Sequence, residues 1–176
     1  MTTSPWFPGV GRTPADEEFL AALRACADEE GLVDAAPADT SVLDWDDALV
    51  VLVDLPGLRW TKTEPVLEVI AAFTSPPHLS AGVEVRGWLT EEADPLDLRR
   101  VELTPAALGR HTYEWLTAQL RRPVERANWS TWRGERSLIR FADDGELIES
   151  DLAAWRRRDR RPDRVEPLRP TGREPA

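Results

Sequence analysis

Residues 48–53, Ala-Leu-Val-Val-Leu-Val, are the longest apolar run of this 176-residue chain. Valine is abundant in the run, and β-branched side chains favour the extended backbone of a strand buried on both faces. The run is much shorter than the roughly 18–20 apolar residues that a membrane-spanning helix needs. We therefore predict a buried strand over residues 48–53 and no contact with a membrane. Pro56-Gly57 predicts the turn that follows it.

Three main helices are predicted around this strand. The first begins at Thr13-Pro14, a hydroxyl N-cap followed by proline at the first helical position, and ends at Gly31. The second covers residues 63–73, with apolar side chains on one stripe at Val66, Ile70 and Phe73. The third covers residues 104–121, where Thr104-Pro105 repeats the same cap; its expected inward side chains are Leu108, Thr112, Trp115, Leu116 and Leu120.

The other expected strands follow from alternation and from turn residues. Residues 82–90 alternate between apolar and polar side chains, as in a half-exposed antiparallel strand. Two more strands are predicted over 124–132 and 137–142, and a turn at 143–145 leads to a last strand over 146–150. A short helix capped by Asp151 comes after it. The sequence thus predicts an α+β fold: an antiparallel or mixed sheet with three main helices packed on one face.

Composition divides the chain into three parts. Residues 1–12 are rich in proline and glycine and predict an extended N-terminal arm, which Trp6 and Phe7 could pin to the domain. Residues 13–155 form the single α+β domain, a size that can bury a substantial core. Residues 156–176, rich in arginine and proline, predict a flexible C-terminal tail.

The residue inventory points away from catalysis. Eight of the thirteen aromatic residues are tryptophan, whereas the chain has two histidines, one cysteine and one lysine, the residue types whose pKa is most readily tuned. No arrangement of them matches a known catalytic motif, so no catalytic residue and no cofactor is predicted. Cys26 alone permits no intrachain disulfide and no cysteine-based zinc site. We expect a cytoplasmic protein, and the strong preference for arginine over lysine is typical of a GC-rich bacterial genome such as that of an actinobacterium.

Charge is unevenly distributed along the chain. Residues 1–98 hold 5 basic and 19 acidic residues, a net charge of −14, whereas residues 99–176 hold 17 basic and 13 acidic residues, a net charge of +4. Within the acidic half, Asp44, Asp46 and Asp47 form with Asp39 a carboxylate cluster that lacks the spacing of a calcium loop. The cluster is interpreted as a solvated loop or as a docking patch for a basic partner.

Tryptophan and arginine supply the expected binding anchors. Trp129 and Trp132 lie three residues apart, so a regular strand would point them to opposite faces and leave one outside the core. Arg133 follows directly. Trp88 and Arg86 fall on the polar side of the strand predicted over 82–90. Tryptophan and arginine are the residue types most enriched at the centres of protein interfaces.

These features favour a non-catalytic protein–protein interaction protein, of the inhibitor, immunity or assembly-chaperone type, whose acidic face meets a basic partner. One alternative is a small-ligand-binding protein or enzyme with a Trp-lined pocket that contains a carboxylate. Another is a DNA-associated regulator that uses the Arg-rich tail, although an acidic domain repels nucleic acid. The sequence leaves the oligomeric state open.

Overall fold

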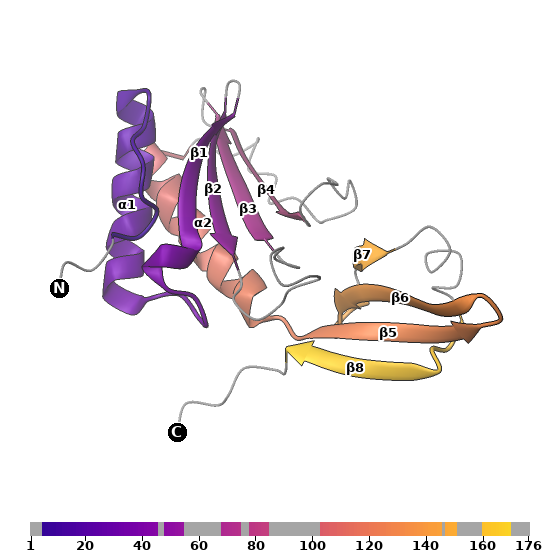
Figure 1. Cartoon of the computed structure of the whole chain (residues 1–176). Coiled ribbons are helices and arrows are strands. Elements are labelled where there is room, and N and C mark those ends of the chain that lie inside the picture. The colour runs from indigo at the N-terminus through magenta and orange to yellow at the C-terminus, as the bar shows by residue number, and fades with distance from the viewer. Residues whose placement is uncertain are drawn as a thin grey trace.

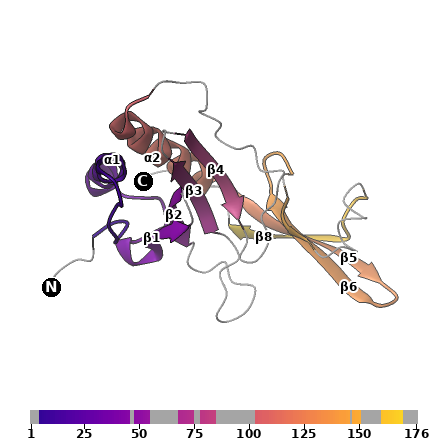
Figure 2. The same ribbon diagram turned by 90° about the horizontal axis from the view of Figure 1, so that it is seen from above.

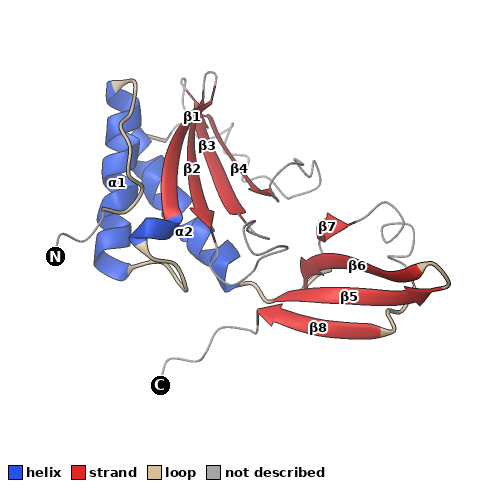
Figure 3. Ribbon diagram, in the orientation of Figure 1, coloured by secondary structure: helices blue, strands red, loops and turns tan. Residues whose placement is uncertain are grey.

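The structure, a computed structural model, describes residues 5–45, 48–54, 68–74, 78–84, 103–145, 147–150 and 160–169. Within these ranges it contains two long helices and two four-stranded antiparallel sheets (Figures 1 and 3). The α+β class is therefore confirmed. The elements in chain order are α1 (Pro14–Glu30), a 3-10 turn η1 (Pro37–Asp39), β1 (Thr40–Trp45), β2 (Ala48–Asp54), β3 (Glu68–Thr74), β4 (His78–Glu84), α2 (Pro105–Arg121), β5 (Val124–Thr131), β6 (Gly134–Phe141), β7 (Leu147–Ser150) and β8 (Arg164–Arg169).

The first sheet is a meander in the order β1-β2-β3-β4, and both helices lie on one side of it (Figures 1 and 2). The strand predicted over 48–53 is β2, where Val51 and Val53 are fully buried. The predicted caps also form. Thr13 Oγ1 accepts the Asp16 backbone N–H at 3.1 Å, and the Asp16 carboxylate accepts the Thr13 N–H at 2.9 Å. This reciprocal capping box satisfies two amides that the first turn of α1 leaves without helical partners.

The helix predicted over 63–73 is wrong for the residues that the structure describes. Residues 68–73 belong to β3, which pairs with β2 on one side and β4 on the other. The run Val69-Ile-Ala-Ala-Phe73 is continuously apolar, and such a short run fits a buried strand as well as a helix stripe. Backbone hydrogen bonding to two neighbouring strands decides in favour of the strand. Val66 lies outside the described residues.

Four other expectations also need correction. The described residues form two sheets instead of one, and they contain two main helices instead of three. The strand predicted over 82–90 is β4, which begins earlier, at His78, and is described to Glu84. The flexible tail predicted over 156–176 is wrong for residues 164–169, because these form β8 and pair with β5. The short helix expected after Asp151 lies outside the described residues up to position 159.

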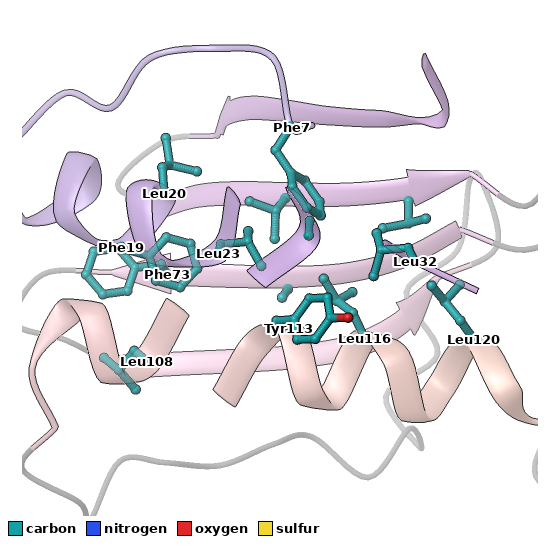
Figure 4. Packing of buried hydrophobic residues seen from close by; sticks show 14 of the residues in the cluster. Phe7, Phe19, Leu20, Leu23, Leu32, Phe73, Leu108, Tyr113, Leu116 and Leu120 are labelled. Carbon is teal, nitrogen blue, oxygen red and sulfur yellow. The ribbon is translucent and has the colours of Figure 1, made fainter. Parts of the chain in front are cut away.

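One apolar cluster joins the helices to both sheets, and Figure 4 shows the part of it between the helices and the first sheet. Phe19 of α1 stacks on Phe73 of β3 with ring centroids 4.6 Å apart. The cluster continues into the second sheet through side chains at the base of β5 and β6. Its largest fully buried members are Phe7, Phe19, Phe73, Phe141, Leu20, Leu23, Leu49, Leu108, Leu116 and Leu120.

The N-terminal arm is tied to this core by Phe7, whose side chain is completely buried. The Phe7 backbone N–H donates to Thr40 Oγ1 at 2.7 Å. The Arg24 guanidinium donates to the carbonyl oxygens of Phe7 and Gly9, at 2.8 and 2.7 Å from Nη2. The arm is therefore held by one buried ring and by a charged side chain from α1.

The two helices approach closely at Gly109 of α2. A Cβ placed there would press on the Phe19 carbonyl oxygen and would lie 3.0 Å from the Ala22 Cβ and 3.1 Å from the Leu23 backbone nitrogen. Most of these atoms belong to the backbone of α1 and cannot rotate away. Glycine is needed here because the helix backbones are in contact.

The junction between α2 and β5 is fixed by Arg122. Its guanidinium lies 3.5 Å from the centroid of the Phe141 ring. Its Nε donates to Asp143 at 3.0 Å, and its Nη2 donates to Asp144 at 2.7 Å. One arginine thus connects the end of α2 to the turn that follows β6.

We expect Gly109→Ala to destabilise the fold. Alanine favours a helix over glycine by about 1 kcal/mol, but overpacking typically costs about 1–3 kcal/mol, and here the obstruction is mainly backbone. Chemical denaturation should therefore show a net loss of stability. Ala118→Gly, at an exposed position of the same helix, calibrates the propensity effect. An increase in stability for Gly109→Ala would disprove the close approach of the helices.

The Arg122–Asp143 contact predicts a pH effect. Hydrogen bonding from Arg122 lowers the pKa of Asp143 below its ordinary value of 3.8. Because the folded-state pKa is the lower one, the stabilisation is present above the unfolded-state pKa and is lost as pH falls through the folded-state pKa. Asp143→Asn should flatten the acid limb of the plot of unfolding free energy against pH. In an Arg122→Gln background, Asp143→Asn should change the acid part of this pH dependence much less than it does in the wild type. If it changes the pH dependence equally in both backgrounds, Arg122 and Asp143 are not paired.

Candidate functional site

The β5–β6 hairpin projects away from the β1–β4 sheet and the helices (Figures 1 and 2). The two strands pair in regular register from Val124↔Phe141 at the base to Thr131↔Gly134 at the tip. Thr131 Oγ1 donates to the Gly134 carbonyl at 2.6 Å and accepts the Arg133 backbone N–H at 3.2 Å. Gly134 has a φ of +112°, a conformation that favours glycine. The tip is therefore a closed, hydrogen-bonded turn.

Trp129 lies inside the second sheet's own small core. It is 3% exposed and belongs to a cluster with Ala127 and Leu138. Its indole N–H donates to the Arg160 carbonyl at 3.2 Å, which gives the buried donor a partner. Trp129 was predicted as a binding anchor, and its burial instead makes it a structural residue.

Trp132 occupies the turn itself and is 85% exposed. The Arg133 guanidinium lies 4.3 Å from the centroid of its ring, within the range of a cation–π contact. This contact restrains a ring that the rest of the chain leaves in solvent. The expectation that one of the two tryptophans lies outside the core is met, with Trp132 the outer one. β5 ends at Thr131, so the separation arises from the turn and not from strand alternation alone.

The remaining predicted site residues are divided between the described and undescribed parts of the chain. Asp44 of β1 is exposed and forms an ion pair with Arg12 at 2.8 Å. Its predicted companions Asp46 and Asp47 lie outside the described residues, as do Arg86 and Trp88. Asp39, the fourth member of the acidic cluster, accepts the Ala36 backbone N–H at 2.7 Å. The structure therefore assigns local structural contacts to the two members it describes.

An acidic surface does occur on α1. Its exposed carboxylates lie at both ends of the helix, and the only basic residue in the α1 sequence is Arg24, whose guanidinium is used to hold the arm. We call this set the α1 acidic surface: Glu17, Glu18, Asp28, Glu29 and Glu30. It was missed as a candidate site because the cap and the apolar stripe of this segment predicted only an amphipathic helix.

A polar hollow on the second sheet was also missed. It has a volume of about 220 Å³ and is open to solvent; its lining residues are Arg126, Asn128, Glu135, Ser137 and Arg164. The lining comes from three strands, and β8 was expected to be flexible tail. The available signal was the polar side chains at alternate positions 126, 128 and 130 of a predicted strand, which mark a polar stretch on one face of that strand.

Other chemically reactive groups have simple structural explanations. His111 Nδ1 lies 3.2 Å from a Glu114 carboxylate oxygen in an exposed pair on α2. Cys26 packs against the main core, and burial raises the pKa of its thiol. Within the ranges that the structure covers, no three His, Cys, Asp or Glu side chains gather as metal ligands. In those same ranges, no helix has the length and apolar character to span a membrane.

The contrast between the two tryptophans predicts opposite effects on stability. Trp129→Ala empties a packed position and should cost about 3–5 kcal/mol of unfolding free energy. Trp132→Ala should change it by no more than about 0.5 kcal/mol, as for an ordinary surface substitution. Urea denaturation followed by circular dichroism measures both without relying on tryptophan fluorescence. Similar losses in the two variants would contradict the assignment of Trp132 to the surface.

No protein-family model, curated protein or solved structure matches this chain. The hairpin tip, the α1 acidic surface and the polar hollow are therefore interpreted from their own residues and geometry.

Proposed function

We propose that this chain is a non-catalytic, cytoplasmic protein-interaction protein, of the inhibitor, immunity or assembly-chaperone type, and that the Trp132–Arg133 turn is its anchor. The exposed Trp132 ring at the tip of a projecting hairpin carries this proposal. A tryptophan side chain contributes a large apolar area when a partner buries it, and its N–H can donate to that partner. Tryptophan and arginine together are the commonest energetic anchors of interfaces.

The turn is already organised for binding. Thr131 ties its two ends together, and the Arg133 guanidinium restrains the Trp132 ring. A ring that is restrained before binding loses less conformational freedom when a partner covers it. The guanidinium of Arg133 is also exposed and can donate to a carboxylate or carbonyl at the rim of the same contact.

The α1 acidic surface supports a basic partner. Its exposed carboxylates give this helix a negative potential, in keeping with the net charge of −14 in residues 1–98. Complementary charge mainly raises the association rate and disfavours partners whose charges do not match. Buried anchors instead slow dissociation. The proposal therefore assigns association rate to the α1 acidic surface and residence time to the hairpin tip.

Affinity capture from the native host, followed by binding kinetics with the recovered partner, tests this division. Trp132→Ala should raise the dissociation constant at least roughly thirtyfold, the loss expected for an interface anchor. The matched control is Val10→Ala, since Val10 is 80% exposed in the N-terminal arm and should not change the affinity.

The charge contribution is tested in the same system. Glu18→Gln with Glu29→Gln should lower the association rate at low salt, and the difference should shrink as salt screens the charges. A partner that binds Trp132→Ala as tightly as the wild type would disprove the anchor. Failure to recover any partner above background, together with a monomer in solution, would disprove the proposed function as a whole.

A further inference from the structure

The polar hollow contains a buried amide that its neighbours do not satisfy. Asn128 is 3% exposed, and none of the described residues gives its Nδ2 group a hydrogen-bond partner. A buried donor without a partner costs free energy that folding must offset, on the order of 1–3 kcal/mol. Groups of this kind are uncommon in folded proteins, and a water or ion bound at the group is one of the explanations for them.

The register places this amide at the centre of the hollow. Asn128 lies opposite Ser137 of β6 on one side and Arg164 of β8 on the other. Arg126, two residues earlier on β5, points to the same face because strand side chains alternate. All four residues line the hollow. The Asn128 side chain thus shares this face and this hollow with a serine and two arginines.

We propose that this hollow binds a carboxylate group, supplied by a free amino acid or by the C-terminus of a peptide. Its donors are the Asn128 amide and the guanidinium groups of Arg126 and Arg164. A carboxylate presents two oxygens in one plane, which matches the planar donors of guanidinium and amide groups. At about 220 Å³ the hollow is smaller than the roughly 300–1,000 Å³ typical of drug-sized ligand pockets, so it suits a single small group.

The charge around the hollow favours a monovalent carboxylate over a phosphate. Arg164 Nη2 lies 3.3 Å from Glu135, and Arg126 Nη1 lies 3.8 Å from Glu166. The two acids offset the two guanidinium charges, so a dianion would not be neutralised there. A carboxylate carries a single negative charge and therefore needs less positive charge around it than a phosphate dianion does. The Asn128 amide and the Ser137 hydroxyl add neutral hydrogen-bond donors.

The Arg164–Glu135 ion pair is the most exposed part of the hollow's lining. Both side chains are well exposed, Arg164 at 63% and Glu135 at 55%, and ion pairs of this kind contribute little stability. Opening the pair therefore costs little and releases a guanidinium for the ligand. Glu135 competes with the ligand carboxylate for Arg164. The same glutamate can accept a hydrogen bond from the ammonium group of a free amino acid.

Titration followed by NMR tests this site with three probes on the full chain. N-acetylglycine carries only the carboxylate and represents a peptide C-terminus, glycine carries carboxylate and ammonium groups, and glycinamide carries only the ammonium group. N-acetylglycine, glycine or both should shift the Asn128 side-chain amide signals saturably, and glycinamide should not. Tighter binding of glycine indicates a free amino acid as the ligand, and tighter binding of N-acetylglycine indicates a peptide C-terminus.

Two variants of the exposed pair should act in opposite directions. Arg164→Gln should weaken binding of N-acetylglycine roughly tenfold or more, because a charged donor is lost. Glu135→Gln should strengthen it, because the competing carboxylate is removed. A purely structural role of the ion pair would instead make both variants weaken binding. Asn128→Asp replaces the amide donor by an acid and removes the reporting side-chain signals; it should abolish the shifts that N-acetylglycine induces in the backbone amide signal of the paired residue Ser137, and its circular dichroism spectrum establishes whether it folds.

The site is disproved if neither carboxylate probe gives a saturable shift, if glycinamide binds equally well, or if Arg164→Gln binds as the wild type does. This inference does not depend on the proposed function. Trp132→Ala should leave the titration of N-acetylglycine unchanged, whereas it should abolish anchoring of the protein partner. The two proposals can therefore fail separately.

Discussion

The close contact between α1 and α2 is the constraint on which the rest of the structure depends. Gly109 lets the two helix backbones touch at Phe19 and Leu23, and this pair then covers one side of the β1–β4 sheet. The same apolar cluster extends to Val124 and Phe141 at the base of the hairpin. Because interiors are packed to near-crystal density, a change in the helix spacing would be transmitted to every element that shares the cluster.

This arrangement explains why the far end of the hairpin is exposed. α2 leads through Arg122 and Pro123 directly into β5, so the base of the hairpin is held in the core by Val124 and Phe141. Eight paired residues at about 3.4 Å per residue carry the tip well beyond that point. An aromatic residue placed at the tip therefore has no core to enter. Trp132 is exposed because of where the chain places it, and Arg133 is the neighbour that restrains it.

Much of the fold could be predicted where local chemistry dominates. The cap at Thr13 correctly predicted where the first helix begins, and the β-branched run correctly predicted the strand β2. Residues 68–73 could not be assigned correctly, since a continuous apolar run becomes a strand only through its two neighbours. β8 was missed for a related reason: Arg164–Arg169 contains a proline and three charged residues, and pairing with β5 and packing of Leu168 against the main core hold it in place. The hollow also depends on β8, so the alternating polar residues of β5 were the only part of it that left a signal in the sequence.

The hollow follows from a property of the second sheet, the change in character along a single face. Near the base this face carries Val124, Ile139 and Phe141, which belong to the main core. Toward the tip the same alternation brings Asn128 and polar partners on both sides of it. Of the tryptophans whose exposure the structure describes, Trp6 and Trp115 pack against the main core and Trp129 fills the smaller one. Most of the tryptophans whose exposure is described thus serve packing, and the case for binding rests on one ring and one unsatisfied amide.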